Sequence, residues 1–249
     1  MKYIIDLDGT LLSGDQPINH SRAFITGLTE RKIDFLIMTN SIRSPESIAE
    51  RLNRAGVCAD PRKIINPVTA VNRYIREKGY SRVSVVGTET EKAQVQAEIT
   101  DQDPQLTVLL DFEKGNIAYD TMQAVFSRIQ SGGDIVSASS SPFYLKNGTH
   151  FLDTGAFTRL FEAASGRTIP VLGKPSAEYF GIAASLLQAE PEEITVIGDD
   201  WSTDIHGGRN AGFKAVLVRS GKYSPGDEDK CPPHRVIDDL RALLPGENG

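Results

Sequence analysis

The chain has 249 residues, of which 39% are hydrophobic and 24% charged, values that exclude disordered, collagen-like and disulfide-rich proteins. The formal net charge is −6 and positive charge is nowhere concentrated, which argues against a nucleic-acid partner. Cys58 and Cys231 form no redox or zinc motif, and no apolar run approaches the roughly 18 residues of a membrane span. We therefore expect a cytoplasmic protein with reduced thiols and no membrane partner.

Hydrophobic runs and helical patterns alternate from the first residues onward. In the first third of the chain, the pattern predicts strands at residues 2–6 and 34–39 and helices at residues 21–31, 44–55 and 67–78. The second of these helices begins with Ser-Pro-Glu, an N-cap followed by proline, and ends at Gly56. Repeated strand–helix pairs are typical of a parallel sheet covered on both faces.

The same alternation continues to the end of the chain. Strands are expected at residues 82–86, 106–110, 134–137, 194–198 and 215–219, and helices at residues 89–99, 119–130, 154–164, 176–188, 202–211 and 236–244. The polar stretch 220–233 ends in two prolines and is expected to be a loop. The predicted fold class is therefore α/β with a parallel sheet.

The strongest chemical signal is the run Asp6-Leu7-Asp8-Gly9-Thr10, which directly follows the first strand. Parallel sheets bind ligands at the carboxyl ends of their strands. Residues two apart in an extended chain point the same way, so Asp6 and Asp8 are expected to face one substrate. Gly9 permits a sharp turn whose N–H groups could bind an anion. The alternative for this short motif is a strand that ends in a solvated loop.

Two weaker signals point to phosphate. Thr39 and Asn40 end another apolar strand, and their hydroxyl and amide groups could bind phosphate oxygens, although both are also ordinary turn formers. Lys174, in Gly-Lys-Pro, could neutralise a phosphate as a point charge. Most lysines, however, are solvated surface residues.

The run Gly198-Asp-Asp-Trp-Ser-Thr-Asp204 follows a strand and opens a helix. Its three carboxylates form an oxygen-rich cluster of the kind that Mg²⁺ prefers. We assign Asp199 and Asp204 to a metal site, whereas Asp200 is equally well explained as the N-cap of the helix. Together, three strand ends and one lysine predict a metal- and phosphate-binding site at one edge of the sheet.

These motifs resemble, in order, the four motifs of the haloacid dehalogenase (HAD) superfamily: DLDGT at 6–10, TN at 39–40, GKP at 173–175 and GDDWSTD at 198–204. The insertion between the second and third motifs is similar to that of subfamily IIA, the NagD-like nitrophenylphosphatases. The resemblance covers nearly the whole chain. It implies a Rossmann-like catalytic core, residues 1–79 and 173–249, with an inserted α/β cap domain, residues 80–172.

The resemblance also implies a mechanism, the Mg²⁺-dependent hydrolysis of a phosphomonoester through an aspartyl phosphate. Asp6 would be the nucleophile, and Asp8 the proton donor and then the general base. The ligands of Mg²⁺ would be the Asp6 carboxylate, the Asp8 carbonyl, Asp199 and, directly or through water, Asp204. The transferring phosphoryl group would be held by four residues: Gly9, Thr39, Asn40 and the catalytic Lys174.

The expected substrate is a small phosphorylated metabolite, such as a nucleoside monophosphate, a sugar phosphate or pyridoxal phosphate. A phosphotransferase that uses the same intermediate is one alternative. A non-catalytic protein that binds such a metabolite is the other, and the intact Asp6, Asp8, Lys174 and Asp199 argue against it.

The cap carries two further expectations. Its serine-rich loop departs from the A-T-N-P-D run usual in NagD-like members, so we expect Ser139, Ser140 and Tyr144 to help set specificity. The alternative is a plain serine-rich turn. Members with this cap often dimerise through it, so a homodimer is one expectation. The sequence shows no distinctive apolar stripe, and the oligomeric state therefore stays open.

Overall fold

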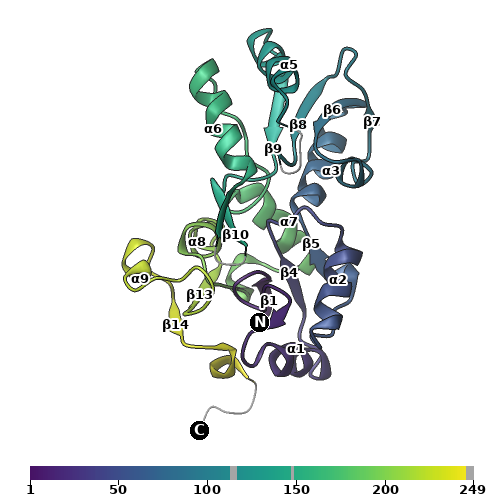
Figure 1. Cartoon of the computed structure of the whole chain (residues 1–249). Coiled ribbons are helices and arrows are strands. Elements are labelled where there is room, and N and C mark those ends of the chain that lie inside the picture. Colours follow the sequence, from purple (N-terminus) through teal and green to yellow (C-terminus); the bar gives the residue numbers. More distant parts are fainter. Residues whose placement is uncertain (113–116, 147–148, 245–249) are drawn as a thin grey trace. The chain divides into compact units, whose positions relative to one another are not determined.

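The structure is a computed structural model that describes residues 1–112, 117–146 and 149–244. The chain forms two compact units, whose elements are labelled in Figure 1. Unit 1 comprises Met1–Thr39, Pro45–Ile65 and Lys174–Gly249, and unit 2 comprises Asn40–Ser44 and Asn66–Gly173. Both are built on parallel sheets, which confirms the predicted α/β class.

A six-stranded parallel sheet with the order β14-β13-β12-β1-β4-β5 forms the centre of unit 1. Its strands are β1 (Lys2–Asp6), β4 (Phe35–Met38), β5 (Ile64–Ile65), β12 (Ile194–Gly198), β13 (Lys214–Val218) and β14 (Arg235–Ile237). The strands β4 and β12 are buried along their whole length. Such continuous apolar runs are expected where helices cover both faces of a sheet.

Helices cover the two faces of this sheet. The helices of unit 1 are α1 (Ser21–Glu30), α2 (Pro45–Arg54), α7 (Ala177–Leu187), α8 (His206–Asn210) and α9 (Asp227–Lys230). Apolar side chains of α1 and α2 share one core cluster with alternate residues of the strands, among them Ile5 and Ile37. Helix α8 packs on Val196 of β12. Adjacent residues of a strand point to opposite faces of the sheet, so α8 covers the face opposite to α1 and α2. The sheet is therefore sandwiched between α1 and α2 on one side and α8 on the other.

Shorter elements connect these parts. A two-stranded antiparallel ribbon, β2 (Leu12–Ser13) and β3 (Gln16–Pro17), lies between β1 and α1. A single π-helical turn, η3 (Trp201–Ile205), precedes α8. Three 3₁₀ turns complete the unit: η1 (Pro61–Lys63), η2 (Pro191–Glu193) and η4 (Leu240–Leu243).

Unit 2 has its own four-stranded parallel sheet, with the order β7-β6-β8-β9. Its strands are β6 (Arg82–Val86), β7 (Glu98–Ile99), β8 (Leu106–Leu109) and β9 (Asp134–Ser137), with a separate hairpin of β10 (Phe143–Lys146) and β11 (Thr149–Leu152). Its helices are α3 (Pro67–Lys78), α4 (Glu89–Lys92), α5 (Tyr119–Gln130) and α6 (Thr154–Ser165). Side chains of α5 and α6 form a core with Val86, Leu109 and Ile135 of this sheet.

The structure differs from the sequence-based element predictions at several places. The expected helix 89–99 ends at Lys92, and its last residues form β7. The expected helix 202–211 is divided into η3 and α8. The expected helix 236–244 is replaced by β14 and the 3₁₀ turn η4. The expected loop 220–233 contains α9, and the hairpin of β10 and β11 was not predicted.

Within residues 1–112, 117–146 and 149–244, no helix is both long and apolar enough to cross a membrane.

Candidate active site

Three predicted site residues lie at the carboxyl ends of adjacent strands of unit 1. Asp6 is the last residue of β1, Thr39 follows β4, and Asp199 follows β12. These strands are parallel neighbours in the order β12-β1-β4, so their carboxyl ends meet at one edge. All three residues are buried.

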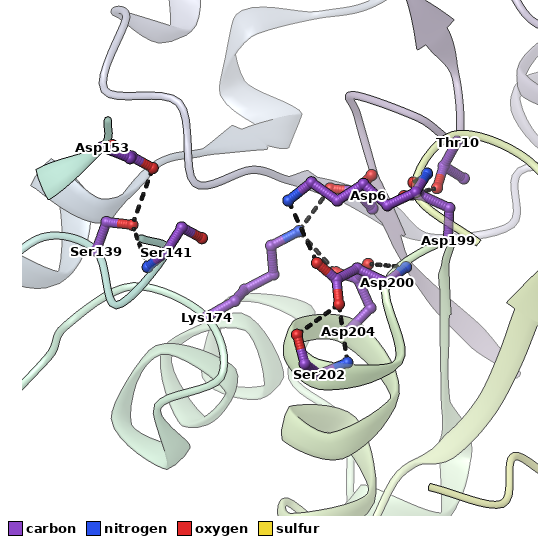
Figure 2. A network of polar contacts seen from close by, with 11 residues as sticks. Asp6, Thr10, Ser139, Ser141, Asp153, Lys174, Asp199, Asp200, Ser202 and Asp204 are labelled. Carbon is purple, nitrogen blue, oxygen red and sulfur yellow. Dashed lines mark hydrogen bonds and ion pairs between the residues drawn. The ribbon is translucent and has the colours of Figure 1, made fainter. Parts of the chain in front are cut away.

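Lys174 links two of the carboxylates (Figure 2). Its ammonium nitrogen lies 2.5 Å from Asp6 Oδ1 and 2.7 Å from Asp204 Oδ1. The lysine is only 4% exposed. Burial by itself lowers its pKa, but the carboxylates of Asp204 and Asp6 outweigh that effect and raise the pKa of Lys174 above its ordinary value. The lysine therefore stays charged at neutral pH.

Asp199 is held by backbone that comes unusually close to it. Its carboxylate accepts hydrogen bonds from Thr10 Oγ1, at 3.2 Å, and from the Lys222 N–H, at 2.6 Å. A Cβ at Gly9 or at Gly221 would come within 2.1 or 2.0 Å of Asp199 Oδ2. Both glycines have positive φ, 103° and 50°, a conformation that glycine adopts at no steric cost. These two positions therefore need glycine to enclose the carboxylate.

Asp6, Asp199 and Asp204 form a buried carboxylate cluster. One oxygen from each lies within 4.8 Å of the other two. Burial, reinforced by Asp6 and Asp204, raises the pKa of Asp199 well above its usual range. Burial likewise raises the pKa of Asp204 to about 7, although Lys174 opposes the shift. Both carboxyl groups therefore hold their protons more strongly than free aspartic acids do, and a cation bound here would have to displace those protons.

The residues of this cluster fit a divalent cation. Asp6 Oδ2 is buried and has no hydrogen-bond partner within residues 1–112, 117–146 and 149–244. An unsatisfied buried carboxylate oxygen is costly unless a partner compensates it. The set of donors consists only of oxygens, which suits Mg²⁺ or Ca²⁺ better than a softer metal. The arrangement can therefore hold a hard metal ion.

Asp8 lies beside the cluster, and its carboxylate reaches solvent with a side chain that is 47% exposed. Arg51 Nη1 lies 2.7 Å from Asp8 Oδ1. Desolvation by the surrounding protein raises the pKa of Asp8, Arg51 opposes this effect, and the Asp6 charge adds to it. A raised pKa favours a carboxyl group that can donate a proton.

Asp200 caps the turn that carries Asp204. Its Oδ1 accepts hydrogen bonds from the Ser202 N–H, at 2.8 Å, and from the Ser202 hydroxyl, at 2.6 Å (Figure 2). Lys222 Nζ lies 3.3 Å from its other oxygen. Of the two interpretations of Asp200, the capping role is the one that these contacts support.

Gly9, Thr39 and Asn40 are the other residues predicted to bind phosphate, and each makes a different contact in the structure. The Gly9 N–H donates to the Leu12 carbonyl, so in this structure Gly9 contacts the site through its close approach to Asp199. The Thr39 carbonyl accepts a hydrogen bond from the buried Tyr179 hydroxyl at 2.9 Å. Asn40 belongs to unit 2, where its Oδ1 lies against Gly173.

The predicted specificity loop also lies in unit 2. Ser139 is buried; its hydroxyl donates to Asp153 Oδ2 at 3.5 Å and accepts from the Ser141 N–H at 3.1 Å (Figure 2). The Tyr144 ring stacks on Phe151 across the hairpin. Ser139 thus stabilises the turn, and a role of Ser139, Ser140 and Tyr144 in specificity stays a prediction.

Sequence reasoning missed three residues at the site. Arg51, Lys222 and Tyr179 contact Asp8, Asp199 and Thr39 respectively. Lys222 acts through its backbone N–H, which no residue type signals. Arg51 and Tyr179 lie inside helices, where nothing in the local pattern distinguishes them from ordinary surface or core positions. Thr10 belongs to the first motif, so its contact with Asp199 was open to prediction.

Two family models match the segments that carry these residues. One is described as a haloacid dehalogenase-like hydrolase and matches residues 3–98, and a second, HAD-hydrolase-like, matches residues 171–243. A relative named acid sugar phosphatase, from Staphylococcus haemolyticus, is 26% identical over 249 residues, which cover 97% of this chain and 94% of the relative.

Solved structures share the fold along nearly their whole length. NagD from E. coli K-12 has a TM-score of 0.88 at 24% identity, with 96% of each chain covered. The p-nitrophenyl phosphatase from Archaeoglobus fulgidus has a TM-score of 0.89 at 22% identity, with 98% of this chain and 97% of that chain covered.

The chain belongs to the haloacid dehalogenase-like hydrolases, with the fold of NagD and of p-nitrophenyl phosphatase. Within this family it is an enzyme of the phosphatase type. The resemblance inferred from its four motifs is thereby confirmed.

Proposed function

We propose that the protein is a Mg²⁺-dependent phosphomonoesterase that hydrolyses a small phosphorylated metabolite through an aspartyl phosphate on Asp6. The observation that carries the proposal is the buried cluster of Asp6, Asp199 and Asp204 around Lys174 at the carboxyl ends of β1 and β12. A parallel sheet binds its ligands at this edge.

The cation would be held by the carboxylates of Asp6, Asp199 and Asp204, with the Asp8 carbonyl as a further ligand. When bound, Mg²⁺ supplies positive charge that screens the repulsion between the Asp6 carboxylate and a phosphate dianion. Lys174 contributes to the same screening from the protein side, because it stays protonated beside Asp6.

The proposed reaction has two halves. First, an Asp6 oxygen bonds to phosphorus, the bond between phosphorus and the leaving oxygen breaks, and Asp8 gives that oxygen its proton. Then water attacks the phosphorus of the aspartyl phosphate, loses a proton to Asp8, and frees both phosphate and Asp6. Thr39, Asn40, Lys174 and the turn at Gly9 would hold the phosphoryl oxygens during both halves.

Sugar phosphates are the substrate class that we propose to test first, since a relative that aligns with 97% of the chain is named a sugar phosphatase. Nucleoside monophosphates and pyridoxal phosphate remain the other candidates. We further propose that residues 80–172 act as a cap domain on a core of residues 1–79 and 173–249. In that cap, Ser139, Ser140 and Tyr144 would contribute to substrate choice.

The first test is phosphate release from a panel of sugar phosphates, nucleoside monophosphates, pyridoxal phosphate and p-nitrophenyl phosphate. We expect release that requires Mg²⁺, stops with chelator, and falls at least about 1,000-fold in Asp6→Asn. The matched control is Asp34→Asn, the same substitution at an exposed residue, which should keep wild-type activity. Release that persists unchanged in Asp6→Asn would refute the proposed nucleophile.

A further inference from the structure

Arg51 makes three contacts with one guanidinium group. Its Nη1 lies 2.7 Å from Asp8 Oδ1, and its Nε lies 3.0 Å from Asp15 Oδ1. Its Nη2 donates to the Gly14 carbonyl. The arginine side chain is only 11% exposed, although Asp15 is 83% exposed. Arg51 is therefore fixed by a set of acceptors and is unlike a mobile surface arginine.

These contacts join three separate parts of unit 1. Arg51 belongs to α2, Asp8 follows β1, and Gly14 and Asp15 form the turn between β2 and β3. The ribbon of β2 and β3 has only two residues in each strand, and so short a ribbon has little stability of its own. The guanidinium of Arg51 therefore connects the ribbon to α2 and at the same time binds the Asp8 carboxylate.

The ribbon is also connected directly to the backbone around Asp8. The Gly9 N–H donates to the Leu12 carbonyl at 2.8 Å, and the Leu12 N–H donates to the Leu7 carbonyl at 2.9 Å. A movement of the ribbon would consequently displace the backbone on both sides of Asp8. Arg51 restrains this residue in two ways, through its carboxylate and through the ribbon.

We propose that Arg51 is a positioning residue that orients the Asp8 carboxylate for proton transfer to the leaving oxygen. This inference rests on the proposed function, in which Asp8 is the proton donor. The contact pattern requires the fork of an arginine, because it uses the three nitrogens of one rigid, planar group. A lysine has a single nitrogen and could not satisfy the same three acceptors with the same geometry.

The test compares two substrates whose leaving groups need the proton to different degrees. An alkyl phosphate, such as a sugar phosphate, expels a basic alkoxide that must be protonated, whereas p-nitrophenyl phosphate expels a stable phenolate. The ratio kcat/KM reports the steps up to the first irreversible one, so it isolates the leaving-group step from the later hydrolysis. A misplaced proton donor should therefore slow only the alkyl substrate.

We expect Arg51→Gln to lower kcat/KM for the alkyl phosphate about 10- to 100-fold and for p-nitrophenyl phosphate less than about 3-fold. Arg51→Lys should restore part of the loss. Arg54→Gln, which removes an exposed arginine from the same helix, is the matched control and should behave like the wild type with both substrates.

A second variant keeps the test decisive if Arg51→Gln fails to fold. Asp15→Ala removes one acceptor of Arg51 at an exposed position and should produce a smaller loss, of about 2- to 5-fold, with the alkyl substrate alone. Equal losses with both substrates, or no loss with either, would overturn the assignment of Arg51. A wild-type protein that hydrolyses neither substrate would instead overturn the proposed function.

Discussion

At the scale of single residues, the site depends on glycines as much as on charged side chains. Gly9 and Gly221 come from segments far apart in the sequence, yet both backbones approach the same oxygen of Asp199. Ser220 strengthens this junction, because its hydroxyl donates to the Gly9 carbonyl at 2.7 Å. The backbone at Gly9 and Gly221 thus sets the orientation of Asp199, and a side chain at either glycine would force the two apart.

Gly9→Ala should weaken metal binding at this site. The new Cβ would displace the Asp199 carboxylate, so we expect Mg²⁺ affinity to fall at least about 10-fold, as measured by calorimetric titration. Gly226→Ala is the matched control, since Gly226 has a similar positive φ of 94° and no heavy atom within 4 Å of the added Cβ. Equal affinities in the two variants would contradict the argument that the close approach of Gly9 to Asp199 shapes the metal site.

At the scale of elements, the turn η3 and helix α8 deliver Asp204 to the site. The predicted helix 202–211 is interrupted there because the Asp204 carboxylate turns inward, where it meets Lys174 and accepts a hydrogen bond from the Asp200 N–H at 3.2 Å. Helix α8 then packs so close to β12 that a Cβ at Gly208 would lie 2.2 Å from Val196 Cγ1. Close helix–strand packing therefore supports the position of Asp204.

Gly208→Ala should destabilise the fold by about 1–3 kcal/mol, because valine is a stiff neighbour and the helix must move away from the strand. Gly181→Ala is the contrasting variant within α7, where the added Cβ meets no atom within 4 Å. This second change should stabilise the protein by up to about 1 kcal/mol, as alanine favours helix. Denaturant unfolding of both variants measures the difference, and a Gly208→Ala protein as stable as the wild type would contradict the packing argument.

Element prediction failed where pairing between distant segments outweighed local pattern. Residues 89–99 have a helical pattern, but Glu98 and Ile99 pair with Arg82 and Val83 of β6. Gln94 holds the bend between them, since its side-chain amide donates to the Ile42 carbonyl at 2.9 Å. The partners in the strand pairing and in this hydrogen bond lie outside residues 89–99, so the local pattern that predicted a helix could not reveal either contact.

At the scale of the whole molecule, the carboxylate cluster links stability to pH and to metal. The pKa of Asp204 rises from 3.8 to about 7 on folding, so between these pH values the folded chain binds more protons than the unfolded chain. By linkage, this group lowers the free energy of unfolding as pH rises from about 4 to about 7. The raised pKa of Asp199 acts in the same direction.

A metal ion competes with the protons bound to Asp199 and Asp204. The stabilisation that the metal provides should therefore grow as pH rises from about 4 to about 7. We expect the difference in unfolding free energy between Mg²⁺ and chelator to increase from pH 5 to pH 7. Denaturant unfolding at each pH measures it, and Asp204→Asn should reduce the pH dependence and leave the part that Asp199 contributes. A difference that stays constant, or shrinks, as pH rises would contradict the assignment of the cluster as a metal site.

The sequence was sufficient to bring Asp6 and Asp199 together, because parallel strands place their carboxyl ends at one edge, and the GKP and GDDWSTD motifs added Lys174 and Asp204. It could not reveal Arg51, whose partner Asp15 lies 36 residues earlier in the chain. That contact depends on how α2 packs, which the hydrophobic pattern of the helix does not specify. Sequence patterns thus predicted the groups that belong to strand ends and motifs, and missed Arg51 and Tyr179, which packed helices supply.

The edges of the two sheets have a consequence for how the protein behaves at high concentration. The six-stranded sheet ends in β5 and β14, of two and three residues, and the sheet of unit 2 ends on one side in the two-residue β7. On its other side, Ser137 of β9 already bonds to the carbonyl of Pro170 and to the N–H of Leu172. A strand from a second molecule would find few unpaired backbone groups there, so these two sheets offer little for edge-to-edge pairing.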